Sequence, residues 1–132
     1  MIALATIADK EQALHQFWSG FGWAARDENT VPDDAMSRFG GHYITYNVAT
    51  AALGEPVPLA ADLWAKDTSW TAITQKAEEI AQAVGMGGKL VAFDGGYLWG
   101  CRGTPFTQRS GDTDDTIRKI HINLMVEFLS AN

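Results

Sequence analysis

The segment TIRKIHINLMVEFLS, residues 116–130, has the clearest hydrophobic period in the chain. Its apolar positions are Ile120, Ile122, Leu124, Val126 and Phe128, and its polar positions are Lys119, His121, Asn123 and Glu127. Alternate residues of an extended chain point to opposite faces, so this pattern predicts a long β-strand with one buried face. A single strand cannot bury that face, so the rest of the chain must supply partner strands and a covering helix.

Two segments have the period of an amphipathic helix. In residues 4–21 the apolar positions are Leu4, Ile7, Leu14, Trp18 and Phe21, and Thr6 with Asp9 predicts an N-terminal capping box. In residues 68–88 the stripe consists of Trp70, Ile73, Ala77, Ile80, Ala81 and Val84, with Thr68 or Ser69 as the expected cap. Glycines follow both segments and predict where the helices end.

The remaining extended segments predict two hairpins. Residues 42–50 and 58–66 are joined by a turn rich in glycine and proline, and residues 89–101 contain the turn Asp94-Gly95-Gly96. In the segment 58–66 one face carries Leu59, Ala61, Leu63 and Ala65, and the opposite face carries Asp62, Trp64 and Lys66. Residues 102–109 read as a further extended piece, residues 110–115 as a polar turn, and residues 20–41 as a long connection without a period.

This order of helix, two strands, helix and further strands predicts one α+β domain over residues 1–132. Strands and helices alternate too little for a parallel sheet, so we expect an antiparallel β-sheet with two helices packed on one face.

Composition narrows the class of protein. The net charge of -6 argues against tight nucleic-acid binding, which depends on Lys and Arg. Cys101 is the single cysteine and cannot form an intramolecular disulfide. The first residues lack a basic region followed by an apolar run, and no segment has the length of a membrane span, so we expect a soluble, unexported protein.

The sequence gives no set of residues that favours catalysis, a metal or a cofactor. Asp112, Asp114 and Asp115 have a spacing seen in calcium loops, but the other ligands are missing and a polar turn is the better interpretation. The three histidines are His15, His42 and His121, and none has a partner at metal-ligand spacing. We interpret Cys101 as a small apolar residue and the glycines after Asp94 as turn residues rather than a phosphate cradle. We therefore expect a protein that is not an enzyme.

Five tryptophans are many for a chain of this length. Trp18 and Trp70 fit the helix stripes, whereas Trp23, Trp64 and Trp99 fall on strands or in a connection. Such aromatic residues are enriched in subunit contacts, although they also cap the sheet edges of monomers.

The chain resembles the tail terminator, or tail completion, proteins of long-tailed bacteriophages. The resemblance lies in Tyr43-Ile44-Thr45-Tyr46, in Asp62-Leu63-Trp64-Ala65-Lys66-Asp67, in Ala77-Glu78-Glu79-Ile80-Ala81 and in the alternating strand after Arg118. It extends over most of the chain from about residue 42 and rests on packing patterns rather than on chemistry.

The resemblance implies a virion protein, made in the host cytoplasm, that forms a ring of usually six copies on the head-proximal end of the tail tube. Its expected partners are further copies, the tail tube protein and the neck or head completion proteins, with DNA passing through the lumen without tight binding. No membrane and no cofactor is expected. A head completion or minor capsid protein, and a stand-alone bacterial α+β binding domain, are the alternatives.

Two sets of residues follow as candidates for such a ring. We expect the subunit contacts to involve Trp64, Trp99, Arg102, Phe106 and Arg109. We expect acidic positions of the ring lining among Glu55, Asp62, Asp112, Asp114 and Asp115. A basic lining would hold the DNA that has to pass, whereas an acidic one repels it.

Overall fold

The computed structural model describes residues 5–110 and 114–130. Its helices and strands are α1 (Ile7–Ser19), β1 (Ala25–Asp27), α2 (Ala35–Arg38), β2 (His42–Tyr46), β3 (Val57–Lys66), α3 (Thr71–Val84), β4 (Lys89–Phe93), β5 (Gly96–Ser110) and β6 (Ile117–Ser130). The α+β class expected from the sequence is confirmed, with three helices and one sheet of six strands in the described residues.

The strands lie in the order β1-β2-β3-β6-β5-β4. Every neighbouring pair is antiparallel except β1 and β2, which are parallel. The expectation of a wholly antiparallel sheet is therefore wrong at one edge. A parallel neighbour needs a crossover between its strands, and residues 28–41, which include α2, provide it.

β6 lies inside the sheet and has the predicted alternation. It pairs with β3 from Val57 to Lys66 and with β5 on its other side. The buried positions include all five apolar residues of the predicted face, with Leu124 only 1% exposed. The register predicted for this strand is confirmed.

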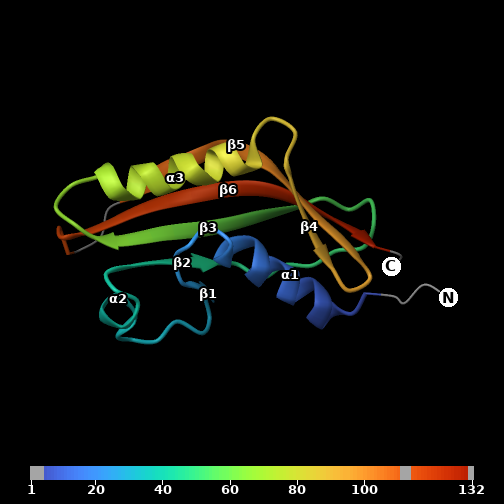
Figure 1. The fold of residues 1–132 in the computed structure, drawn as a ribbon, viewed down its shortest axis with the longest axis horizontal. Helices are drawn as coiled ribbons and strands as arrows, with labels where there is room; N and C mark the ends of the chain where they lie inside the picture. The colour runs from blue at the N-terminus through green and yellow to red at the C-terminus, as the bar shows by residue number, and fades with distance from the viewer. Residues whose placement is uncertain (1–4, 111–113, 131–132) are drawn as a thin grey trace.

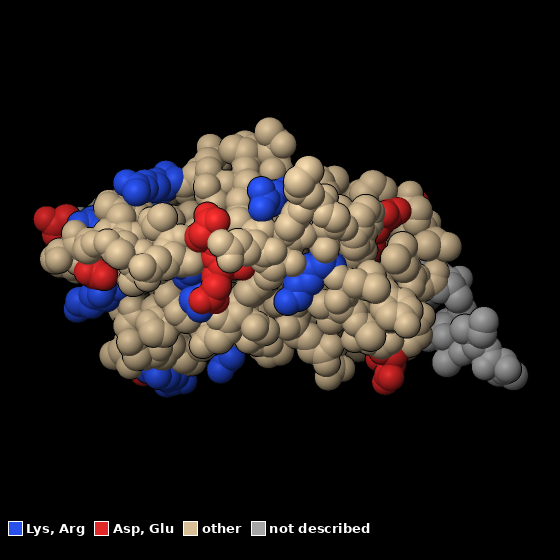
Figure 2. All heavy atoms as spheres, turned by 45° about the horizontal axis from the view of Figure 1, so that its top comes forward, with Lys and Arg blue, Asp and Glu red and all other residues tan. Residues whose placement is uncertain are grey.

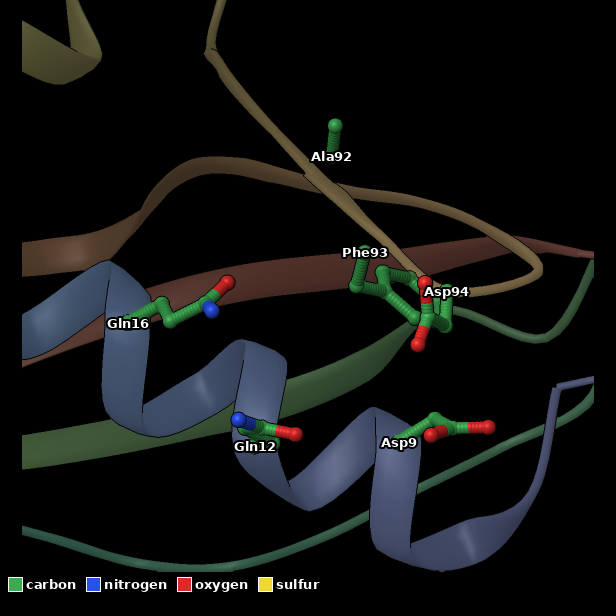
Figure 3. Close-up of a pocket in the computed structure, with 6 residues that line it drawn as sticks. All are labelled: Asp9, Gln12, Gln16, Ala92, Phe93 and Asp94. Carbon is green, nitrogen blue, oxygen red and sulfur yellow. The ribbon is translucent and has the colours of Figure 1, made fainter.

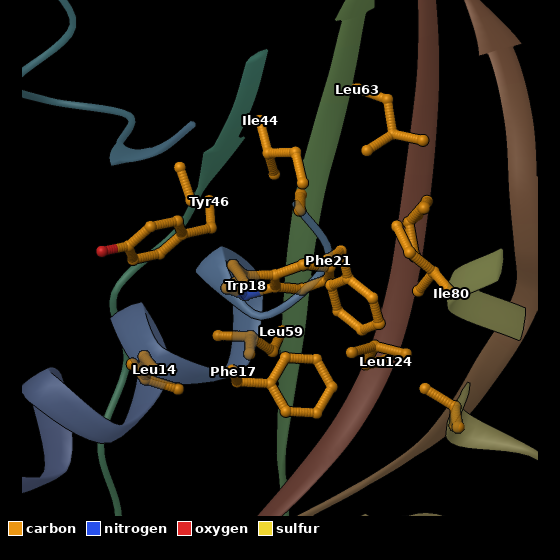
Figure 4. Packing of buried hydrophobic residues seen from close by; sticks show 14 of the residues in the cluster. Leu14, Phe17, Trp18, Phe21, Ile44, Tyr46, Leu59, Leu63, Ile80 and Leu124 are labelled. Atoms are coloured by element: carbon orange, nitrogen blue, oxygen red, sulfur yellow. The ribbon is translucent and has the colours of Figure 1, made fainter. Parts of the chain in front are cut away.

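The buried residues of the strands and of two helices form one hydrophobic cluster (Figure 4). α1 contributes Leu14, Phe17 and Trp18, and the aromatic rings of Phe17 and Trp18 meet edge to face at 5.1 Å. From α3 come Ile73, Ala77, Ile80 and Val84. In Figure 1, α3 runs along β5 and β6, whereas the end of β4 lies near α1.

The capping box at the start of α1 is present. Thr6 accepts a hydrogen bond from the backbone of Asp9, and the Asp9 carboxylate accepts one from the backbone of Thr6. The predicted stripe needs one correction, because Ile7 is 65% exposed and Lys10 is buried instead. The Lys10 ammonium donates to the carbonyl of Ala51 at 3.0 Å, which gives this buried group a hydrogen-bond partner inside the fold. Leu4 lies outside the described residues.

α3 begins later than the sequence suggested. Its N-cap is Trp70, without a side-chain capping bond, so the expected cap at Thr68 or Ser69 is wrong. The Ser69 hydroxyl instead accepts from the backbone N–H of Thr71 at 3.1 Å. The predicted stripe is buried at four positions, while Trp70 and Ala81 are partly exposed.

The connection over residues 20–41 is more ordered than expected. It contains β1 and α2, each too short to have a recognisable period. Trp23 stacks on His42 with ring centres 4.5 Å apart.

Both predicted hairpins are confirmed, and β5 is longer than predicted. Gly95, with a φ of 95°, makes the turn between β4 and β5, where a Cβ would come within 2.8 Å of the Ala5 backbone. The expected separate piece over 102–109 belongs to β5 and pairs with β6 after an irregularity between Arg102 and Thr107. We call residues 103–106 the β5 bulge; it contains the cis bond Thr104-Pro105.

Candidate functional site

The sheet has two faces with different surroundings. Alternate side chains on one face join the hydrophobic cluster, and we call this the buried face. The other face, called the open face, carries Asp62 and Trp64 of β3 and the odd-numbered residues 119–129 of β6. The predicted contact residues divide between the two: Trp64 and Trp99 lie on the open face, whereas Arg102 and Arg109 pair with the buried positions Leu124 and Ile120.

Trp64 is held by neighbours within its own chain. Its indole stacks on Tyr43, with ring centres 5.9 Å apart and planes inclined by 12°. Its Nε1–H donates to the hydroxyl of Thr45 at 3.0 Å, and the Lys119 ammonium lies 4.8 Å from a ring centre. These contacts hold the Trp64 side chain against the open face. Only part of its surface remains exposed to a partner.

Trp99 anchors the loop between α3 and β4. Its Nε1–H donates to the carbonyl of Gly87 at 3.0 Å. Gly88 has a φ of 87°, and a Cβ there would lie 2.4 Å from the same nitrogen. Trp99 therefore fixes a loop as well as covering part of the open face.

An exposed apolar band continues from Trp99 along the open face. It consists of Leu90 of β4, Tyr97 of β5, and Met125 and Leu129 of β6. Tyr97 is opposite Leu129, and Leu90 is opposite Trp99. This band was not predicted from the sequence, although Met125 and Leu129 interrupt the polar side of the last strand and were a signal for it. Exposed apolar groups that adjoin one another mark binding surfaces.

Arg102, Phe106 and Arg109 meet at a groove between α3 and β5, which we call the α3–β5 groove. It has a volume of about 400 Å³, and its lining includes Ala77, Glu78, Arg102, Phe106, Arg109 and Ile120. The Arg102 guanidinium lies 5.3 Å from the Phe106 ring centre and donates to the carbonyl of Ala81 at 2.7 Å. Arg109 lies 4.5 Å over Trp70. These three predicted contact residues are thus brought together.

The predicted acidic residues are not brought together. Glu55 is exposed in the loop before β3, at the end of the sheet where Val57 faces Val126. Asp114 and Asp115 are exposed at the opposite end, before β6. Hydrogen bonds from the hydroxyl and backbone of Thr116 hold the pKa of Asp114 below its ordinary value. Asp112 lies outside the described residues.

Asp62 differs from the other acidic candidates because its carboxylate is paired. It lies 2.8 Å from Nδ1 of His121 and 3.9 Å from the Lys119 ammonium. Nε2 of His121 is 3.2 Å from the amide oxygen of Asn123, whose Nδ2 donates to the carbonyl of Pro105. A polar chain therefore links β3 and β6 to the β5 bulge. Sequence reasoning missed it because Asp62 and His121 are far apart in the chain and meet only through the strand register.

A hollow of about 400 Å³ lies between α1 and β4 (Figure 3). Asp9, Gln12 and Gln16 of α1 face Phe93 of β4 and Asp94 of the following turn across it. Asp9 is already engaged in the capping box, and the hydrogen bonds from the backbone and hydroxyl of Thr6 lower its pKa. A carboxylate used in this way is a poor acid or base, so we assign no chemistry to the hollow.

The other residues considered for chemistry lie apart from one another. Within residues 5–110 and 114–130 there is no group of three His, Cys, Asp or Glu side chains arranged to hold a metal ion. Nδ1 of His15 lies 3.1 Å from the Tyr46 hydroxyl. Burial, and to a smaller degree the Glu127 carboxylate, raises the pKa of the Cys101 thiol. No helix in the part of the chain described is long and apolar enough to cross a membrane.

Comparison of the chain with protein-family models, with curated proteins and with solved structures finds no match. The resemblance to tail terminator proteins described above rests on the residues and on the order of the elements alone.

Proposed function

We propose that the protein is a structural subunit of a bacteriophage tail: a tail terminator that forms a ring on the head-proximal end of the tail tube. The observation that carries the proposal is the exposed apolar band on the open face. Leu90 and Tyr97, 56% and 49% exposed, lie on the three adjacent strands that also carry Met125 and Leu129, and Glu127, opposite Trp99, lies between these last two residues. A surface of this kind is stabilised when another subunit covers it.

The arrangement of the elements supports the same proposal. The segments that carry the resemblance lie in β2, β3, α3 and β6, and the strands among them are neighbours in the sheet. α1 and α3 both contribute to the single hydrophobic cluster. We include in the proposal the finer fold assignment, a terminator-like sheet with these two helices packed on one face.

The charge of the chain fits a ring through which DNA passes. Six copies at -6 each carry -36, so the lumen would be acidic or neutral unless most basic residues gathered there. Glu55, Asp114 and Asp115 are exposed and are the described acidic positions that we propose for the lining. Asp62 contributes less, because His121 and Lys119 pair with it. An acidic lining repels the duplex and lets it slide.

The proposal is tested by separating the parts of a phage that encodes this protein. Headless tails and tailless heads are purified from assembly-defective mutants and analysed by mass spectrometry. We expect the protein on headless tails, as a ring at one end of the tube in electron micrographs. Its presence on tailless heads alone would identify a head completion protein. Its absence from both would favour a stand-alone bacterial domain.

A pair of variants tests the role of the apolar band. Leu129→Glu places a charge in the band, whereas Gln108→Glu places one on the polar part of the same face, opposite His121. We expect Leu129→Glu to leave tails without the ring and Gln108→Glu to assemble normally. Equal assembly by both variants would show that the band is not a contact surface.

A further inference from the structure

The free edges of the sheet differ in how their backbone groups are used. In β1, the Arg26 guanidinium donates to the carbonyl of Ala25, and both N–H and Oγ1 of Thr30 donate to the carbonyl of Asp27. These bonds occupy carbonyls that a further strand would need. The β1 edge is therefore poorly suited to strand addition and presents side chains instead.

The loop that follows β1 is acidic and internally bonded. We call residues 27–34 the acidic loop; its charged members are Asp27, Glu28, Asp33 and Asp34. The backbone of Asn29 donates to the Asp27 carboxylate, and that of Ala35 donates to the carbonyl of Pro32. Asp34 pairs with Arg38, whereas Glu28 and Asp33 are exposed and form no ion pair within the described residues.

The α3–β5 groove lies toward the other edge of the sheet. β4 pairs with β5 only from Gly96 to Gly100, so the groove segment from Arg102 to Arg109 has β6 as its one strand neighbour in the described residues. Arg102 and Arg109 are exposed, and neither pairs with a carboxylate in residues 5–110 or 114–130. Phe106 and Ile120 supply an apolar floor between the two cations.

The two surfaces are complementary and lie on different sides of the subunit. β1 is the first strand in the order of the sheet, whereas β5 is the fifth. A contact between such surfaces is heterologous, so it leaves one groove and one loop available on each pair and can continue into a ring. Over the face seen in Figure 2, basic and acidic side chains lie in small mixed groups, so local pairs rather than one broad field would select the partner.

We propose that the α3–β5 groove binds the acidic loop of a second copy of this chain, with Arg102 and Arg109 facing Glu28 and Asp33. This rests on the proposed ring and names its subunit contact. Glu78 on the α3 side of the groove opposes the incoming loop, although Gln82 donates to it at 3.4 Å. The two arginines attract the acidic loop and Glu78 repels it, so the strength of the contact depends on the balance between them.

Charge reversal tests the contact. Arg109→Glu and Asp33→Arg are made separately and together, and assembly is measured by sedimentation at high concentration and by ring occupancy on tail tubes. We expect each single variant to weaken association about tenfold or more and the two single variants, mixed, to associate with each other. Glu78→Gln should strengthen association. Gln108→Glu, which adds a negative charge next to Arg109 in the chain but on the open face opposite His121, is the matched control and should have little effect.

Disulfide trapping tests the same contact without changing its charges. In a Cys101→Ser background, Asn29→Cys and Thr107→Cys place one thiol in the acidic loop and one on the groove. We expect cross-linked copies from this pair and few from Asn29→Cys with Gln108→Cys, because Gln108 lies opposite His121 on the open face.

The outcomes separate the contact from the function. If the charge-reversal variants form rings on tubes as the wild type does, and no cross-link is found, the proposed contact is wrong. The tail terminator proposal would then still stand. A wild-type chain that forms no ring on tubes and does not associate in solution would overturn both.

Discussion

The buried and open faces of the sheet are built from the same strands and are used differently. In β6, Leu124 is 1% exposed within the hydrophobic cluster, whereas its neighbour Met125 is 38% exposed on the open face. On the buried face the β6 side chains from Ile120 to Phe128 are apolar, and on the open face polar groups give way to a mainly apolar band. The comparison shows that one face accounts for the fold, while the other has apolar surface that the fold does not need.

The largest expected effect lies on the buried face. Leu124→Ala removes a large side chain from the middle of the cluster and should cost about 2 to 5 kcal/mol in free energy of unfolding. Met125→Ala, one residue along, should change it by less than about 0.5 kcal/mol. Denaturant unfolding of both variants measures the difference, and equal values would contradict the face assignment.

On the open face the largest effect should come from Trp64. Trp64→Ala removes the stack on Tyr43 and the hydrogen bond to Thr45, which is itself buried, and should cost about 1 to 3 kcal/mol. Trp64→Phe keeps an aromatic ring and should recover part of that loss. An unchanged free energy of unfolding in Trp64→Ala would mean that the indole is not needed for the fold and that its surface is available for a partner.

A smaller effect should follow from cutting the polar chain. Asn123→Ala removes the hydrogen bond to the Pro105 carbonyl and should cost about 1 kcal/mol. Amide hydrogen exchange over the β5 bulge should become faster, while exchange in β3 stays unchanged. Uniform acceleration over the whole sheet would indicate a general loss of stability rather than a local one.

The smallest expected effect is a change in the reactivity of the Cys101 thiol. Because burial and the nearby Glu127 carboxylate raise its thiol pKa, less thiolate is present at pH 8 than in an unfolded chain. We expect slower alkylation in the native protein than in denaturant, and faster native alkylation in Glu127→Gln. The thiolate is the form that reacts, so a raised thiol pKa slows alkylation at pH 8. An equal alkylation rate in native and denatured protein would contradict this prediction.

Periodic patterns explain why much of the fold could be predicted from the sequence. The alternation around Leu124, the capping box at Thr6 and the turn at Gly95 are local signals that the structure confirms. β1 and α2 could not be predicted, since three or four residues have no measurable period.

The candidate surfaces were harder to predict than the fold. Asp62 meets His121, and Leu90 meets Trp99, only because particular registers hold between strands. Arg102, Phe106 and Arg109 were expected to form contacts, but their position beside α3 depends on packing between distant segments. A linear sequence specifies which residues alternate and leaves open which residues become neighbours across strands.

The β5 bulge has a consequence for which residues share a face. Between Arg102 and Thr107, β5 advances five residues while β6 advances two, from Leu124 to Ile122. The side-chain alternation therefore changes phase: even-numbered residues of β5 face the core side before the bulge, and odd-numbered residues do so after it. Arg102 and Arg109 differ in parity and would fall on opposite faces of an unbroken strand. With one residue removed from 103–106, Arg102 and Arg109 would be six residues apart and would share the core side of an unbroken strand without the bulge. The length of this short segment therefore decides which side of the sheet receives the second cation.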